Sequence, residues 1–129
     1  METILLVDDE AEIRMVVRKM LESRGYVVLD AGDPHEALRL ATGQQVDLLV
    51  TDVVMPRMRG TELARRLQAL VPSVKVLLIS AYEVADVATS GYPFLAKPFT
   101  PDVLDEKVRQ VLRAQPSPFA RKPPPRPAR

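Results

Sequence analysis

A chain of 129 residues, 47% hydrophobic and 27% charged, has the composition of one ordinary globular domain. It has no cysteine, which excludes disulfide-stapled folds and thiolate chemistry, and no hydrophobic run approaches the roughly 18 residues that a membrane span needs. The formal net charge of +1 combines a mildly acidic body with a basic C-terminal segment. No pattern of a signal peptide is present, and we expect a cytoplasmic protein without membrane contact.

The first third of the chain alternates between strand-like and helix-like patterns. Residues 3–7 form a hydrophobic run typical of a buried strand, and residues 11–24 carry hydrophobic residues at helical spacing before Gly25. Residues 26–31 predict a second strand. The hydrophobic face predicted for the first helix consists of Ile13, Val16, Val17, Met20 and Leu21.

The second helix has a clear start signal. Asp33 is placed to cap it, Pro34 takes the first helical position, and Glu36 stands three residues after the cap. Residues 47–52 then predict a third strand that is hydrophobic almost throughout.

The remaining elements repeat the alternation. Residues 61–70 predict a helix, residues 75–80 a fourth strand, residues 94–96 a short fifth strand, and residues 102–113 a last helix. The inward face predicted for this last helix consists of Val103, Leu104, Val108, Val111 and Leu112.

Hydrophobic strands separated by helices imply a parallel sheet that is covered on both faces, an α/β fold. Five such units within residues 1–113 fit a flavodoxin-like doubly wound sheet of order 2-1-3-4-5. In this order the functional crevice lies at the carboxyl ends of the strands, between the first and the third.

Three acids fall at this crevice. Asp8 and Asp9 follow the first strand, and Asp52 ends the third, so their carboxylates should converge. Their mutual repulsion is costly unless a cation lies between them. Mg²⁺, which prefers oxygen ligands and a few carboxylates, is the expected partner.

Two further polar residues end the neighbouring strands. Ser80 ends the fourth strand, and Lys97 follows the fifth with a stem long enough to reach the acids. A carboxylate, a cation site, a hydroxyl and an ammonium together describe a pocket for a phosphoryl group. Asp52 is then the expected nucleophile, forming an aspartyl phosphate.

These motifs, "VDDE", "DVVMP", Ser80 and "KPF", resemble the receiver domain of two-component response regulators over residues 3–113. The resemblance implies that a histidine kinase or a histidine phosphotransfer protein phosphorylates Asp52. It also implies that Mg²⁺ binds Asp9, Asp52 and the backbone carbonyl of Val54, while Asp8 acts through water.

The same resemblance assigns the remaining roles. Ser80 and Lys97 bind the phosphoryl oxygens, and Phe94 occupies the aromatic switch position. The Lys97–Pro98 bond is expected to be cis. Such a domain promotes its own phosphorylation and dephosphorylation only, and it signals by binding a protein partner or by passing the phosphoryl group onward. No direct DNA binding is expected.

Each of these residues also has an ordinary structural explanation. Asp8 and Asp9 could cap the helix that follows them, Ser80 could cap a helix together with Glu83, and Lys97 could be a solvated loop lysine. His35, in the first turn of a surface helix, is expected to be exposed. None of these explanations accounts for four polar residues at adjacent strand ends.

Two other functions fit the same fold. A nucleotide- or flavin-binding domain needs a glycine- or hydroxyl-rich phosphate loop after the first strand, but "DDEAEIR" has none. A phosphatase that forms an aspartyl phosphate on a D-x-D motif would carry its nucleophile on the first strand, whereas here the candidate nucleophile is on the third.

The chain departs from the receiver pattern in two places. Only residues 83–89 remain for a fourth helix, which is shorter than is usual in receivers, where this surface often forms dimers. Val54 and Tyr82 are bulky residues beside the expected path of the attacking water, which favours slow autodephosphorylation.

Residues 114–129 hold six of the 12 prolines and four basic residues, and we expect a disordered tail.

Overall fold

The computed structural model describes residues 1–81 and 85–114, with the side chains of residues 85 and 86 excepted. Within this part of the chain, five strands form one parallel sheet of order β2-β1-β3-β4-β5. The predicted fold class and strand order are therefore confirmed. The strands are β1 Thr3–Val7, β2 Val27–Ala31, β3 Leu48–Asp52, β4 Lys75–Ser80 and β5 Phe94–Ala96.

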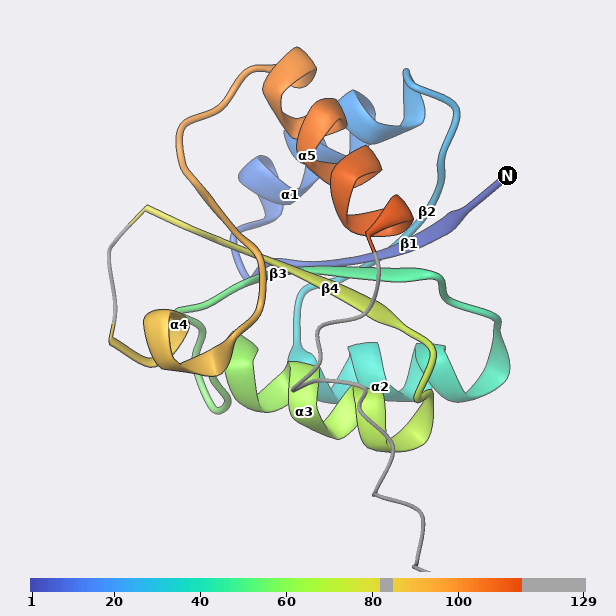
Figure 1. Cartoon of the computed structure of the whole chain (residues 1–129). Coiled ribbons are helices and arrows are strands. Elements are labelled where there is room, and N and C mark those ends of the chain that lie inside the picture. Colours follow the sequence, from blue (N-terminus) through green and yellow to red (C-terminus); the bar gives the residue numbers. More distant parts are fainter. Residues whose placement is uncertain (82–84, 115–129) are drawn as a thin grey trace, which may run out of the picture.

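Helices cover both faces of the sheet (Figure 1). One face carries α1 and α5, and the opposite face carries α2, α3 and α4. These helices are α1 Ala11–Glu22, α2 Pro34–Gly43, α3 Gly60–Leu70, α4 Ala85–Ser90 and α5 Pro101–Arg113. In this described part of the chain, no helix is both long and hydrophobic enough to cross a membrane.

Side chains of one strand alternate between two hydrophobic clusters. Leu5 and Val7 of β1 belong to the cluster beneath α2 and α3, whereas Ile4 and Leu6 belong to the cluster beneath α1 and α5. This alternation is the expected period of two residues along a strand. Because both faces are buried, β1 reads as a continuous hydrophobic run in the sequence.

The start of α2 follows its sequence signal. The Asp33 carboxylate accepts from the backbone N–H of His35 at 2.6 Å, and Pro34 occupies the first turn. The backbone hydrogen bond from His35 lowers the pKa of Asp33 below its usual value. The Glu36 carboxylate accepts from Gly32 rather than from Asp33, so the reciprocal half of the capping box is shifted by one residue.

Several boundaries and faces differ from the prediction. The first helix ends at Glu22, not at residue 24, because Gly25 has a φ of 93° and turns the chain there. Val16 and Val103, expected in the core, are 53% and 47% exposed. Helical spacing identifies the hydrophobic side of a helix but does not tell how far the neighbouring element covers it.

The fourth helix is short, as predicted. α4 spans six residues, and the residues directly before it lie outside the described part of the chain. The expected start of this helix at Glu83 and the expectation for Tyr82 therefore remain predictions. The same holds for the domain boundary and for the tail, since the described part of the chain ends at Ala114.

Candidate functional site

The three acids predicted at the strand ends lie together. Asp8 and Asp9 follow β1, and Asp52 ends β3, which pairs directly with β1 through Val7 and Thr51. One carboxylate oxygen from each acid lies within 4.8 Å of the other two. The strand pairing thus brings into one cluster residues that are more than 40 positions apart in the sequence.

The two neighbouring acids have different surroundings. Asp8 is fully buried, and its Oδ1 accepts from the Glu10 backbone N–H at 2.9 Å. Its Oδ2 accepts from the Lys97 ammonium at 3.2 Å. Asp9 is exposed. Asp8 therefore belongs to the wall of the pocket, and Asp9 presents its carboxylate to solvent.

Lys97 reaches the acids from the end of β5, two strands away from β3. Its backbone N–H donates to the Ser80 carbonyl at 2.9 Å, and its peptide bond to Pro98 is cis, as expected. The ammonium lies 3.2 Å from both Asp8 Oδ2 and Asp52 Oδ2, and the side chain is only 14% exposed. The predicted convergence of lysine and acids is present.

Burial and the neighbouring charges have opposite effects on the pKa values of Asp52 and Lys97. Burial raises the pKa of Asp52, although the Lys97 ammonium works in the opposite direction. Burial also works to lower the pKa of Lys97, but the Asp8 and Asp52 carboxylates outweigh it and the pKa lies above its usual value. Lys97 is therefore charged at neutral pH.

Ser80 lies on β4, which pairs with the strand of Asp52, and Phe94 lies on β5, one strand further. Ser80 is the last residue of β4 and is 1% exposed. Its predicted alternative role as a helix cap together with Glu83 involves residues outside the described part of the chain and stays a prediction. Phe94 pairs with Leu78, and residues two apart share one face of a strand, so Phe94 and Ser80 lie on the same side. Phe94 is partly buried against the cluster beneath α2 and α3.

The loop between β3 and α3 passes very close to Asp52. The Gly60 N–H donates to the Val53 carbonyl at 2.8 Å, and the Val54 N–H donates to Asp52 Oδ1 at 3.4 Å. A Cβ atom on Gly60 would stand 2.2 Å from the Asp52 carbonyl oxygen. Only glycine fits at this position without moving the backbone of Asp52. Gly60 was not among the site residues predicted from the sequence.

The family model of the response regulator receiver domain matches residues 4–109 of the chain. The chain belongs to this family. Receiver domains are the phosphoacceptor domains of two-component signalling, and histidine kinases phosphorylate them. Family membership thus supports the phosphoacceptor function and gives no support to the nucleotide-binding or phosphatase alternatives.

Individual relatives agree with this assignment. The sensor kinase CckA of Brucella abortus (strain 2308) is 39% identical over 121 residues, which cover 88% of this chain and 13% of CckA. The solved structure of the chemotaxis protein CheY4 of Vibrio cholerae has a TM-score of 0.81 at 30% identity and covers 86% of this chain and 98% of its own. The response regulator TrrA of Thermotoga maritima, solved in complex with Mg(2+)-BeF, has a TM-score of 0.78 at 32% identity and covers 86% and 99%.

The chain spans about half the length, or less, of the curated relatives it matches. Those relatives include a sensor kinase and transcriptional regulators. The similarity therefore concerns the receiver domain that they share with this chain.

The acids of this receiver domain are suited to hold Mg²⁺. Ligands on opposite sides of an octahedral Mg²⁺ lie about 4.2 Å apart, close to the 4.8 Å limit within which the three carboxylate oxygens gather. Three carboxylates against the Lys97 ammonium leave an excess of negative charge that a divalent cation balances. The donor set consists of oxygen atoms, which Mg²⁺ prefers.

The ordinary structural roles expected for Asp8 and His35 are present in the structure. Asp8 does accept from the Glu10 N–H before α1, so part of its role is structural, but it bonds Lys97 as well. His35 is exposed, as expected. Arg14, which contacts the backbone of Asp8, was not predicted from the sequence. A cation near the start of a helix, where acids are favoured, was the available signal.

Proposed function

We propose that Asp52 is the residue of this receiver domain that accepts the phosphoryl group from a histidine kinase or a histidine phosphotransfer protein. The observation that carries the proposal is the meeting of Asp52 with Asp8, Asp9 and Lys97 at the carboxyl edge of the sheet. Asp52 ends a fully buried strand, and its carboxylate is 11% exposed, so it is held in place yet open to a donor.

In the transfer, an Asp52 carboxylate oxygen forms a bond to phosphorus. The bond between phosphorus and the donor's imidazole nitrogen breaks, and its electron pair leaves with that nitrogen. The Lys97 ammonium, now shared by Asp8 and Asp52, would move its hydrogen bonds to a phosphoryl oxygen. Ser80, at the end of the neighbouring strand, would donate its hydroxyl to another.

Mg²⁺ would be held by the Asp9 and Asp52 carboxylates and the Val54 carbonyl. Asp8 would act through water, because both of its oxygens already accept hydrogen bonds from Glu10 and Lys97. Bound Mg²⁺ supplies positive charge between the carboxylates and the incoming phosphoryl oxygens, which otherwise repel one another.

The proposed signal starts at Ser80 and Phe94. When the Ser80 hydroxyl moves toward the phosphoryl group, the Phe94 ring moves into the space that the hydroxyl leaves. The phosphoryl group thereby shifts the equilibrium between two conformations of Ser80 and Phe94. The output is the binding of a protein partner or onward transfer of the phosphoryl group in the cytoplasm. We expect slow loss of the phosphoryl group, because Val54, 43% exposed beside Asp52, narrows the approach of water.

Mass spectrometry of the intact protein tests the assignment. Wild type and the variants Asp52→Asn and Asp33→Asn are incubated with acetyl phosphate and Mg²⁺. Wild type and Asp33→Asn should gain the mass of one phosphoryl group, and Asp52→Asn should gain none. Asp33 is the matched control, since it is an acid of the same sequence that lies at the start of α2.

An adduct of unchanged yield on Asp52→Asn would show that another residue accepts the phosphoryl group. Absence of an adduct from wild type under conditions that include Mg²⁺ would contradict the proposal as a whole.

A further inference from the structure

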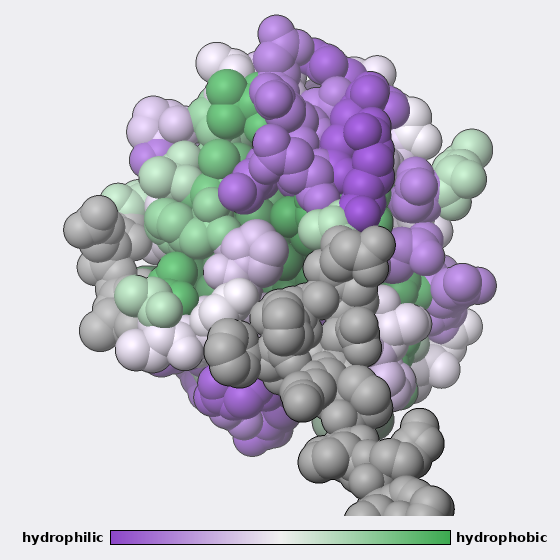
Figure 2. Space-filling view, in the orientation of Figure 1, coloured by the Kyte–Doolittle hydropathy of each residue, from purple (hydrophilic) through white to green (hydrophobic). Residues whose placement is uncertain are grey.

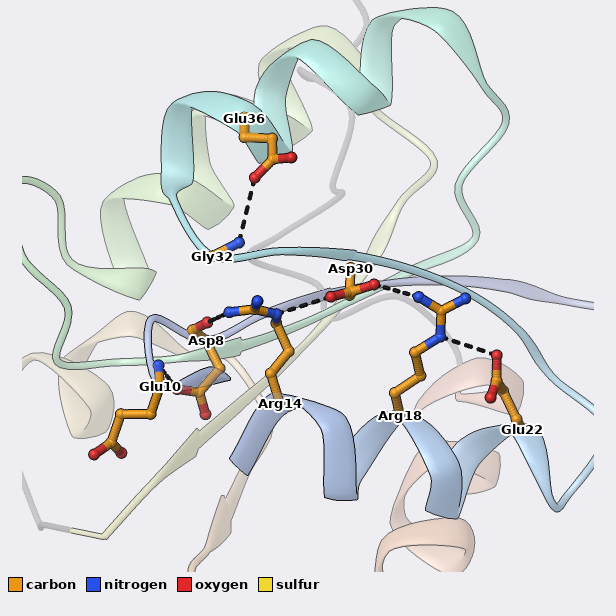
Figure 3. A network of polar contacts seen from close by, with 8 residues as sticks. All are labelled: Asp8, Glu10, Arg14, Arg18, Glu22, Asp30, Gly32 and Glu36. Atoms are coloured by element: carbon orange, nitrogen blue, oxygen red, sulfur yellow. Dashed lines mark hydrogen bonds and ion pairs between the residues drawn. The ribbon is translucent and has the colours of Figure 1, made fainter. Parts of the chain in front are cut away.

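A chain of ion pairs connects α1 and β2 to the acidic cluster (Figure 3). The Arg14 guanidinium donates from Nη1 to the backbone carbonyl of Asp8 at 2.6 Å and from Nε to Asp30 Oδ2 at 2.8 Å. Asp30 also pairs with Arg18, which in turn donates to Glu22 at 2.9 Å. Arg14 is the member of this chain that touches the acidic cluster.

Arg14 binds the carbonyl of the peptide bond between Asp8 and Asp9. The carbonyl of Asp8 belongs to the planar unit that joins Asp8 to Asp9, so fixing that oxygen fixes the direction in which Asp9 leaves β1. The Asp8 N–H donates to the Ala31 carbonyl at 3.2 Å. Asp8 is thus held at its N–H by β2 and at its carbonyl by Arg14.

The surroundings are shaped to hold the Arg14 side chain. It is 20% exposed and its partner Asp30 is 25% exposed, which makes this pair better shielded than an ordinary surface ion pair. A Cβ atom on Gly32 would stand 2.8 Å from Arg14 Nη1, the nitrogen that bonds Asp8. Glycine at position 32 therefore leaves the space that this guanidinium occupies.

We propose that Arg14 is a positioning residue that sets the Asp8–Asp9 peptide so that the Asp9 carboxylate is preorganised to bind Mg²⁺. The inference rests on the proposed function, in which Asp9 is a direct ligand. A planar guanidinium spans the Asp8 carbonyl and the Asp30 carboxylate at once, which a single ammonium does not do with the same geometry.

A positioning role and a purely electrostatic role of Arg14 predict opposite changes in Mg²⁺ affinity when Arg14 is substituted. Arg14 is a cation, and a cation near the pocket repels Mg²⁺, so removing its charge alone should tighten metal binding. Loss of positioning should weaken it. Removal of a group that orients a metal ligand typically costs 10- to 100-fold in affinity.

The test measures Mg²⁺ affinity by isothermal titration calorimetry and the amide chemical shifts of residues 8–10 without metal. Three variants disturb the contact: Arg14→Gln, Arg14→Lys and Gly32→Ala. Each should weaken Mg²⁺ binding by roughly tenfold and shift these amides. Gly32→Ala is the sharpest, because it displaces the guanidinium while keeping every charge.

Arg18→Gln is the matched control. It removes a cation from the same helix and from the same partner, Asp30, but Arg18 is 40% exposed and does not contact Asp8. Its Mg²⁺ affinity should remain within about twofold of wild type or increase slightly.

Mg²⁺ affinity equal to wild type, or tighter, in Arg14→Lys and Gly32→Ala would overturn the inference and leave the proposed function intact. If wild type itself binds no Mg²⁺, the metal site of the proposed function is wrong and the inference falls with it. Should Arg14→Gln unfold, the two milder variants still decide between the outcomes.

Discussion

Among the described residues, the Lys97 ammonium is the one cation that pairs with the acidic cluster of Asp8, Asp9 and Asp52. It lies 3.2 Å from the Asp8 and Asp52 carboxylates. Asp8 and Asp52 share that counter-charge, whereas Asp9 adds negative charge without an ion pair in the described part of the chain. A cluster of this kind opposes folding when no metal is present, because like charges are held together. We therefore expect the acidic cluster to lower the stability of the metal-free domain.

The stability of Asp9→Asn should reveal this conflict. Without metal, the variant should unfold at a higher temperature than wild type, with a gain of up to about 1 kcal/mol from relieved repulsion. In Mg²⁺ at 100 times its dissociation constant, wild type should gain about 2.7 kcal/mol and the variant little. Thermal unfolding with and without Mg²⁺ measures both effects.

Glu12→Gln is the control for this experiment, since it removes an exposed acid of α1 that is not in the cluster. It should keep the full gain from Mg²⁺. If Asp9→Asn kept that gain as well, Asp9 would not be a metal ligand.

Gly60→Ala should disturb the site without changing any charge. Its Cβ would overlap the Asp52 carbonyl oxygen, so the backbone has to shift at a cost of about 1–3 kcal/mol in the free energy of unfolding. Because Asp52 moves with its carbonyl, phosphorylation by acetyl phosphate should slow as well. Denaturant unfolding and the rate of adduct formation measure the two effects.

Gly43→Ala provides the comparison. A Cβ at this last residue of α2 meets no atom within 4 Å, and alanine favours a helix, so stability should stay equal or rise slightly. Equal effects of the two substitutions would mean that the close approach at Asp52 is not what requires glycine.

At the scale of elements, one buried acid fixes α5 to the turn between α1 and β2. The Asp105 carboxylate accepts from Arg24 at 3.2 Å and from the Tyr26 hydroxyl at 3.3 Å, and it forms an ion pair at 3.2 Å with Arg109 of its own helix. Asp105 is 6% exposed, and burial of Tyr26 together with the nearby Asp105 charge raises the pKa of that hydroxyl. These contacts add to the hydrophobic packing of Leu104, Val108 and Val111 that holds α5 on the sheet.

Asp105→Ala should lower the free energy of unfolding by about 1–3 kcal/mol, because it leaves the Tyr26 hydroxyl and the Arg24 guanidinium without this partner. Asp102→Ala should have a smaller effect, since the Asp102 side chain is 86% exposed although it also pairs with Arg24. Urea unfolding of the two variants makes the comparison. A larger loss for Asp102→Ala would contradict the role given to burial.

The order of elements could be predicted from the sequence because hydrophobic runs and helix signals such as Asp33–Pro34 are local. The meeting of Asp8, Asp52 and Lys97 could be predicted as well, since parallel strands end at one edge of the sheet. The contact of Arg14 with Asp8 and Asp30 could not, because no periodicity encodes which side chains meet between a helix and a neighbouring strand.

At the scale of the whole molecule, α4, β5 and α5 come together at one edge of the sheet. Figure 2 shows hydrophilic residues over the outer side of α5 and hydrophobic residues reaching the surface beside it, toward the β5 edge of the sheet. Val103 of α5 is 47% exposed, and Leu95 of β5 is partly buried. Phe94 is itself a residue of β5, so the proposed switch at Phe94 would change this face.

The same face is poorly suited to a symmetric dimer through α4. Six helical residues rise only about 9 Å, while a stable interface buries about 800 Å² on each partner. Sedimentation velocity with Mg²⁺ should therefore show the same species with and without beryllofluoride, which mimics a phosphoryl group on Asp52. That species is either a monomer or a dimer formed by another face.

Substitution at α4 completes this test. Ala88 is an exposed residue of α4, and Ala88→Arg places a charge where a dimer through this helix would have to form. We expect the variant to sediment like wild type in both conditions, because little of the association energy can come from so short a helix. A dimer that appears only with beryllofluoride and disappears in Ala88→Arg would show that even this short α4 carries the output, and that the signal of Phe94 is read by a second copy of the domain.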